Sequence, residues 1–237
     1  MSKCHSGLVR SLAGVAMLAS APASACELAL LLAVDVSGSV DATEYRIQME
    51  GLAAGLRDPV VSEVLVKGEA AVALVQWTGA SRQDLTIPWT RIATPADLDS
   101  LAENIIAAPR LWIEFSTAIG EALEFASQVF DDAPACRRRV IDISGDGRSN
   151  EGVEPLAIHD LLQSLAITVN ALVIRGDDDG LPQYFAENVI LGPNSFVVTA
   201  ESYEEYPERM QRKLRRETER PVSLGPVDGV VPIRFDE

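Results

Sequence analysis

Histidine is almost missing from this sequence: of 237 residues, only His5 and His159 carry an imidazole. His5 lies in an N-terminal segment that we expect to be removed, which leaves His159 alone. Neither a Ser-His-Asp nor a Cys-His catalytic arrangement can be assembled around it, and its helical surroundings indicate a surface or hydrogen-bonded histidine. The glycine-rich patterns of nucleotide-binding loops are absent as well. The sequence therefore does not support a histidine-dependent hydrolase or a nucleotide-binding enzyme.

Positive charge is also scarce, with 20 lysine and arginine residues against 35 aspartate and glutamate residues and a net charge of −15. A chain this acidic does not bind nucleic acid non-specifically, since phosphate binding needs the opposite sign. We interpret most of these charges as a solvated acidic surface. Long apolar runs occur only near the N-terminus, so no membrane span is expected and the processed protein is predicted to be soluble.

The first 25 residues have the features of a secretory signal peptide. Lys3 and Arg10 accompany a mainly apolar stretch, and Ala23 and Ala25 supply the small-residue cleavage pattern. We therefore predict an exported protein, periplasmic or secreted. Its expected parts are a signal peptide (1–25), one domain (26–217) and a flexible C-terminal tail (218–237).

The most informative pattern follows an uninterrupted apolar run at 28–34, which is typical of a strand buried on both faces. Asp35, Ser37 and Ser39 then stand at alternate positions where this strand ends. In open α/β sheets, ligands bind at the carboxyl ends of the strands. One carboxylate and two hydroxyl groups suit a hard cation such as Mg²⁺. For this motif alone, the alternative is a loop that caps the helix expected near Asp41.

Two later segments favour the metal site. Thr117 stands at the start of an amphipathic helix, and Asp146 follows a second apolar strand within Ser144-Gly145-Asp146-Gly147. With the first motif, this arrangement resembles the von Willebrand factor A domain and its metal-ion-dependent adhesion site (MIDAS), in a bacterial exported family of undefined function. The resemblance implies five metal ligands: Asp35, Ser37, Ser39, Thr117 and Asp146. Because many such domains have Thr-Asp-Gly or Ser-Asp-Gly in the third loop, Asp142 is a rival to Asp146, although it lies inside the apolar run.

The resemblance also implies a fold and a function. The fold would be α/β, a doubly wound, mostly parallel sheet with helices on both faces and one antiparallel edge strand. The function would be protein binding, in which a divalent cation (Mg²⁺ first, Mn²⁺ or Ca²⁺ as alternatives) captures an aspartate or glutamate of an unknown partner. No catalytic residue is predicted. The alternatives are a metal-assisted, phosphatase-like hydrolase with Asp35 as nucleophile, and a structural domain with a vestigial site.

Two cysteines, Cys26 and Cys136, remain after removal of the signal peptide, and an even number in an exported protein indicates a disulfide. Cys26 lies nine residues before Asp35, and Cys136 lies ten before Asp146. If the two strands are adjacent and parallel, their pairing brings the two cysteines together at one end and the two aspartates together at the other. The bond would be worth about 4–5 kcal/mol on the chain-entropy model. The alternative is a lipidated Cys26, but Ala23 stands where lipoprotein signals usually have a large aliphatic residue.

Elsewhere helices and strands alternate, as expected for an α/β chain. Helices are predicted at 42–56, 95–107, 117–130, 155–165, 181–188 and 203–216, and strands at 70–77, 83–89, 168–174 and 196–199. We interpret the basic end of the last helix (212–216) as solvent-exposed and complementary to the helix dipole, with a partner patch as the alternative. We interpret Trp112 as a core or rim packing residue; with Phe115 it is also a candidate for an apolar lip beside the metal. The run Asp177–Asp179 is interpreted as a solvated turn.

Overall fold

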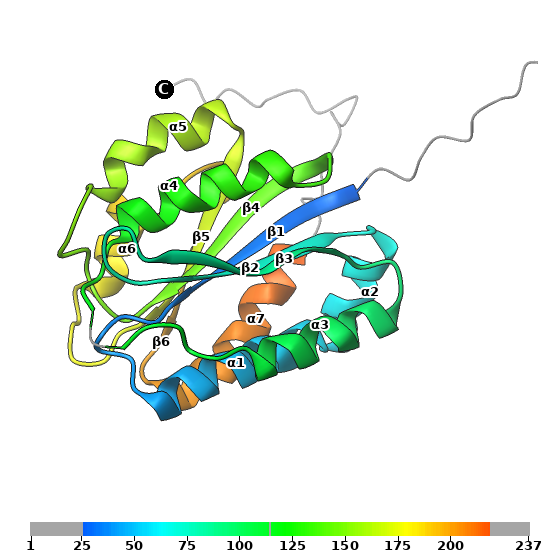
Figure 1. Ribbon diagram of the computed structural model, residues 1–237, viewed down its shortest axis with the longest axis horizontal. Helices are drawn as coiled ribbons and strands as arrows, with labels where there is room; N and C mark the ends of the chain where they lie inside the picture. The colour runs from blue at the N-terminus through cyan, green and yellow to red at the C-terminus, as the bar shows by residue number, and fades with distance from the viewer. Residues whose placement is uncertain (1–25, 114, 219–237) are drawn as a thin grey trace, which may run out of the picture.

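A six-stranded sheet lies between two layers of helices (Figure 1). The computed structural model describes residues 26–113 and 115–218, so the predicted signal peptide and all but the first residue of the predicted tail lie outside it. The strands are β1 (Cys26–Asp35), β2 (Ala71–Trp77), β3 (Gln83–Arg91), β4 (Cys136–Gly145), β5 (Ile167–Ile174) and β6 (Val197–Ala200), in the order β3-β2-β1-β4-β5-β6. Every neighbouring pair is parallel except β2 with β3 at the edge. The predicted fold class is confirmed.

The helices cover both faces of the sheet, and β1 shows why (Figure 1). One face carries α1 (Ala42–Leu56), α2 (Pro59–Lys67), α3 (Pro95–Ala107) and α7 (Tyr206–Thr218), and the other carries α4 (Ile119–Val129), α5 (His159–Ser164) and α6 (Leu181–Asn188). Along β1, Leu30 and Leu32 pack toward the first layer and Leu31 packs toward the second. Because successive side chains of a strand point to opposite faces, an uninterrupted apolar run is needed to fill both cores.

Local capping signals explain most of the helix boundaries. Asp41 and Glu44 form a capping box that starts α1, and Thr94 caps α3 with Pro95 in its first turn. The bounds predicted for α1, α3 and α6 are confirmed. Short 3₁₀ turns, η1 (Phe130–Asp132), η2 (Pro155–Ile158) and η3 (Tyr203–Glu205), adjoin α4, α5 and α7. Helix α2 was not predicted, although Asp58 caps it and Pro59 opens it.

The disulfide between Cys26 and Cys136 is present. The two cysteines are direct partners in the parallel pairing of β1 with β4, and their Cα atoms are 4.4 Å apart. The sulfur of Cys26 is engaged in this bond and is not free for lipid attachment. The bond joins the amino ends of the two central strands, so it lies at the opposite edge of the sheet from Asp35 and Asp146.

The basic end of α7 differs from the expectation of a solvent-exposed cluster. Lys213 is completely buried, with Nζ 2.5 Å from Asp142 Oδ1 and 3.0 Å from Glu217 Oε1. Burial raises the pKa of Asp142 to about 6, although the Lys213 charge opposes the shift. Nearby, Arg215 bonds the buried carboxylate of Asp58. The solvent interpretation is therefore wrong for Lys213, which anchors α7 to β4.

Among the described residues, no helix combines the length and the apolar character needed to cross a bilayer.

Candidate metal centre

Three loops meet at the carboxyl edge of the sheet, the edge from which α1 starts (Figure 1). The loop after β1 bonds the segment before α4, because Gly38 N–H donates to the Phe115 carbonyl at 2.7 Å. It also bonds the loop after β4, because Ser39 Oγ donates to Asp146 Oδ1 at 2.6 Å. β1 and β4 are neighbours, and the chain leaves β1 toward β2 on one side and reaches β4 on the other, which makes this a topological switch point. The five predicted ligands thus lie on loops that are joined to one another.

Asp35 is completely buried at the end of β1. Its Oδ1 accepts the Ser37 amide at 2.7 Å, whereas Oδ2 accepts no hydrogen bond from the described residues. A Cβ at Gly145 would lie only 3.1 Å from Oδ2, so the glycine keeps the space beside this oxygen open. Burial, and after it the charge of Asp146, raises the pKa of Asp35 to about 7. A buried carboxylate oxygen without a hydrogen-bond donor is available as a ligand for a cation.

The two serines of the first loop do not cap α1. Their Oγ atoms are 3.2 Å apart, and Ser37 is completely buried. The cap is Asp41, whose Oδ1 accepts the amides of Thr43 and Glu44 at 2.6 and 2.8 Å. The capping interpretation of Asp35 and Ser39 is therefore wrong, and both side chains remain available for another role.

Asp146 is held by two hydroxyl groups from distant parts of the chain. Oδ1 accepts from Ser39, and Oδ2 accepts from the Tyr203 hydroxyl at 2.8 Å. Tyr203 is buried in η3, at the start of the α7 segment. Burial and the charge of Asp146 raise the pKa of Tyr203 well above its usual range, so the phenol remains a donor. Sequence reasoning missed Tyr203, because this contact spans 57 residues and has no local signal.

Thr117 is held in place by two hydrogen bonds of its backbone, neither of which uses its side-chain hydroxyl. Its amide donates to Asn150 Oδ1 at 2.9 Å, and the Asn150 amide donates to the Thr117 carbonyl at 2.8 Å. Helix α4 begins at Ile119, after Ala118, which has no capping side chain; Ser149 Oγ accepts the Ile119 amide instead. A Cβ at Gly147 would lie 3.6 Å from Thr117 Oγ1, so the third loop passes beside this hydroxyl. Asn150 and Ser149 were not predicted.

The resulting set of donors is two carboxylates, Asp35 and Asp146, and three hydroxyl groups, Ser37, Ser39 and Thr117. Within the described ranges, no three or more histidine, cysteine, aspartate or glutamate side chains are grouped to hold a metal. Any cation here would thus rely on hydroxyl oxygens, which suit hard ions such as Mg²⁺. Two carboxylates also match the charge of one divalent ion.

The other aspartates considered as metal ligands form ion pairs with basic side chains. Asp142 lies beneath α7 with Lys213, as described above, so neither its carboxylate nor this lysine faces the three loops. In the run after β5, Asp178 pairs with Arg148 at 2.8 Å, and Asp179 pairs with Arg175. These arginine pairs agree with the interpretation of that run as a surface turn.

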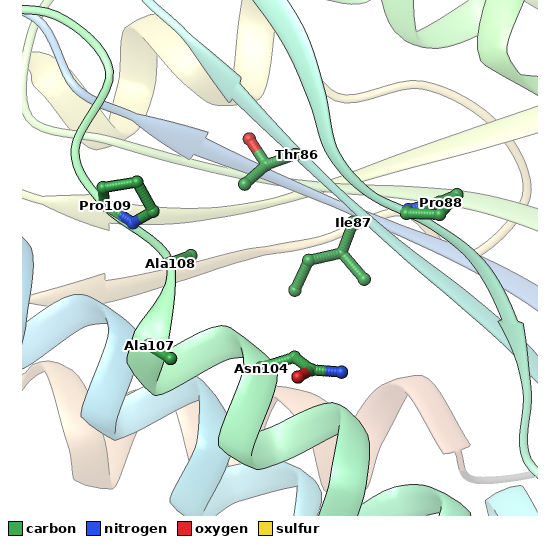
Figure 2. Close-up of a pocket in the computed structure, with 7 residues that line it drawn as sticks. All are labelled: Thr86, Ile87, Pro88, Asn104, Ala107, Ala108 and Pro109. Atoms are coloured by element: carbon green, nitrogen blue, oxygen red, sulfur yellow. The ribbon is translucent and has the colours of Figure 1, made fainter.

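An open depression of about 300 Å³ lies between β3 and the end of α3. In Figure 2, Ile87 points from the strand toward the helix that carries Asn104, and Pro109 lies across from them, next to Ala108. It shares no residue with the three-loop site, and none of its lining side chains is ionisable. The depression thus offers apolar, hydroxyl and amide contacts but no acidic or basic side chain.

Residues 25–222 match a family described as "Protein of unknown function (DUF1194)". The chain belongs to this family. No curated protein matches it.

Solved structures place the DUF1194 chain in a known fold. Proximal thread matrix protein 1 from the mussel byssus superposes with a TM-score of 0.63 at 19% identity, over 80% of this chain and 47% of that one. A structure of the same mussel protein "with zinc occupied MIDAS motif" gives 0.58 at 18% identity, over 80% and 48%. The von Willebrand factor type A protein from Catenulispora acidiphila gives 0.58 at 20% identity, over 82% and 43%. This chain therefore spans about half of each relative's length or less, and the likeness establishes a von Willebrand factor A fold.

Proposed function

We propose that this protein is an exported, divalent-cation-dependent protein-binding module. Asp35, Ser37, Ser39, Thr117 and Asp146 would hold the ion, which is Mg²⁺ first, with Mn²⁺ or Ca²⁺ as alternatives. When bound, the ion would supply a positive charge that the carboxylate of a partner's aspartate or glutamate can coordinate. The fold neighbours include one with a zinc-occupied MIDAS motif, which supports the cation but leaves its identity open.

The observation that carries the proposal is the buried, unpartnered carboxylate oxygen of Asp35. A buried carboxylate with one unpartnered oxygen costs free energy unless a cation or a proton compensates it. Asp35 has that oxygen next to the space kept by Gly145, and no lysine or arginine side chain is hydrogen-bonded to it. A purely structural aspartate at this position would be expected to have a hydrogen-bond donor on each oxygen.

The surrounding residues hold the other donors in place before any ligand arrives. Tyr203 and Ser39 orient the Asp146 carboxylate, and Asn150 fixes the backbone of Thr117. Such outer partners limit the reorganisation that binding would require. Five protein oxygens with two formal charges leave a divalent ion electrically satisfied but short of a full shell of six or more ligands. An incoming carboxylate can complete that shell, which is why we favour capture of an acidic side chain.

The hydrolase alternative receives no support from the described residues. A phosphatase of the Asp-x-Asp type needs a second carboxylate two residues after the nucleophile, and Ser37 stands there. Lys213 is buried beneath α7, and Lys67 ends α2. No lysine of the described chain is therefore placed to neutralise a phosphate at this site.

A direct test uses immobilised peptides with a central glutamate and otherwise glycine and serine, beside counterparts with glutamine. We expect multivalently displayed protein to bind the glutamate peptide in Mg²⁺ or Mn²⁺ and to release it in chelator. Thr117→Val removes one proposed ligand hydroxyl and should weaken the binding at least about tenfold. The backbone hydrogen bonds of this residue to Asn150 remain, so we expect the loop to keep its conformation. Thr90→Val, at the far end of β3, is the matched control. Equal binding of the glutamine peptide, or binding that survives chelator, would contradict the proposal.

A further inference from the structure

The loop before Thr117 exposes several large apolar side chains. Ile113 is 65% exposed, Leu111 40% and Phe115 37%, and Val153 from the third loop is 40% exposed. We call these four residues the apolar rim. Trp112 is partly buried and packs against the core of the α1 layer, in agreement with its interpretation as a packing residue, so we do not include it in the rim. Exposed apolar groups that gather in one place usually mark an interaction surface.

The apolar rim is attached directly to the predicted metal loops. The Phe115 carbonyl accepts the Gly38 amide, and Arg110 donates to the carbonyls of Val36 and Ser37 at 3.2 and 2.9 Å. The Arg82 guanidinium, from the turn between β2 and β3, lies 3.9 Å from the centre of the Phe115 ring. This part of the rim is therefore fixed on the β2–β3 side of β1.

Val153 lies on the same side. Its amide donates to Glu121 in the first turn of α4, at 2.8 Å. In the same loop, Glu151 accepts the Ala80 amide from the turn between β2 and β3, at 2.9 Å. The third loop thus bridges to the same turn that carries Arg82, so the segments of all four apolar residues are connected at this turn.

Carboxylates gather near Asp146. Asp41 follows Ser39 by two residues, Glu44 accepts the Asp41 amide at 2.7 Å, and Glu204 directly follows Tyr203. We call these three the acidic rim. Partial burial, then the charges of Asp41, Asp146 and Glu204, raises the pKa of Glu44, which agrees with their closeness. No lysine or arginine is paired with Asp41, Glu44 or Glu204 within 4.0 Å in the described chain.

We propose that the two rims select the partner: a protein segment whose metal-directed acidic residue is flanked by an apolar side chain on one side and a basic side chain on the other. The apolar neighbour packs on Leu111, Ile113, Phe115 and Val153, and the basic neighbour faces Asp41, Glu44 and Glu204. This inference rests on the proposed function, because the acidic residue sets the register of the segment. An acidic residue alone would be repelled by the acidic rim, so a basic neighbour offsets that repulsion.

The test extends the peptide experiment to the residues beside the central glutamate. One neighbour is leucine or serine and the other is lysine, serine or glutamate, in both orders, with glutamine-centred counterparts. We expect the leucine-plus-lysine peptide to bind at least about tenfold more tightly than the serine-plus-serine peptide in Mg²⁺, which corresponds to about 1.4 kcal/mol. The leucine-plus-glutamate peptide should bind more weakly than the leucine-plus-lysine peptide.

Variants separate the two rims. Leu111→Ser with Ile113→Ser should abolish the leucine preference and keep the lysine preference, with Mg²⁺ affinity measured by calorimetry unchanged. The matched control is Leu161→Ser with Val60→Ser, two exposed apolar residues on α5 and α2. Glu44→Gln with Glu204→Gln should abolish only the lysine preference; glutamine retains the capping role at position 44. Glu63→Gln on α2 is its control.

The outcomes distinguish this inference from the function it rests on. Metal-dependent binding of every glutamate peptide with equal affinity would overturn the rim selection and leave the proposed function standing. Metal binding without metal-dependent recognition of any glutamate peptide would overturn both. A leucine-plus-lysine preference that persists in chelator, or with glutamine at the centre, would also overturn the inference, because the rims would then act without the acidic residue.

Discussion

Replacing the buried Asp35 with asparagine should remove metal binding and yet stabilise the metal-free protein. The carboxylate is fully buried with one unpartnered oxygen, and its pKa rises from 3.8 to about 7 on folding. The folded state therefore holds a proton more tightly than the unfolded chain does. Stability falls as the pH rises from about 4 to about 7, and the loss is constant above that. Asparagine keeps the side-chain oxygen that accepts the Ser37 amide but does not titrate.

The size of the effect follows from the pKa difference. One pKa unit corresponds to about 1.4 kcal/mol, so the Asp35 carboxylate lowers the free energy of unfolding by about 4 kcal/mol at pH 8 and by about 1–2 kcal/mol at pH 5. The unpaired amide N–H that the asparagine side chain introduces adds a cost of about 1–3 kcal/mol that does not depend on pH. This cost cancels when the two pH values are compared. The stability of Asp35→Asn relative to the parent should therefore rise by about 3 kcal/mol between pH 5 and pH 8.

The assay is thermal unfolding of both proteins in chelator at the two pH values. For a domain of this size, the difference corresponds to a relative gain in Tm of about 6–12 °C. Asp177→Asn, an exposed aspartate on the turn after β5, controls for the change in net charge. A relative Tm that is the same at both pH values would refute the reasoning, because it would show that Asp35 titrates normally. Saturating Mg²⁺ should reverse the order of stabilities at pH 8.

Three further predictions follow from contacts outside the ligand set. Tyr203→Phe should lower Mg²⁺ affinity about tenfold in calorimetry with little change in Tm, since only the hydrogen bond to Asp146 is lost; unchanged affinity would contradict the positioning role. Lys213→Met should lower Tm by about 10 °C or more at pH 8 and by less at pH 5, because the carboxylates left unpaired can then take up protons; a loss below about 3 °C would show that the pair contributes little. Replacing Cys26 and Cys136 with serine should cost about 4–5 kcal/mol in chemical denaturation, and a cost near zero would contradict the loop-entropy account.

The elements that the sequence predicted well are those with local causes. The bounds of α1 and α3 follow from the caps Asp41 and Thr94, and β1 follows from its apolar run. The disulfide could be predicted because the two cysteines precede Asp35 and Asp146 by similar spacings, nine and ten residues, on two strands expected to be neighbours. By contrast, α2 is rich in β-branched valine, which lowers helix propensity, and is stabilised by packing of Val61 and Leu65.

The candidate site also has parts with a local sequence signal and parts without one. The five predicted ligands could be placed on loops because each follows a strand end or opens a helix. Tyr203 could not be predicted, because its bond to Asp146 joins the third loop to the start of α7. Lys213 had a signal that was not used: it shares a helical face with Met210, Leu214 and Glu217, all buried. The apolar rim was anticipated at Phe115.

The measurement that tests the central claim most directly is calorimetric titration of the chelator-stripped protein with Mg²⁺, Mn²⁺ and Ca²⁺, beside Asp146→Asn and Asp177→Asn. The two variants change the net charge equally, and only the first removes a predicted ligand. We predict saturable one-site binding by the parent and by Asp177→Asn, and loss of at least about tenfold in affinity for Asp146→Asn. Equal binding by all three proteins, or no binding of any ion at millimolar concentration, would contradict a metal site built from the three loops.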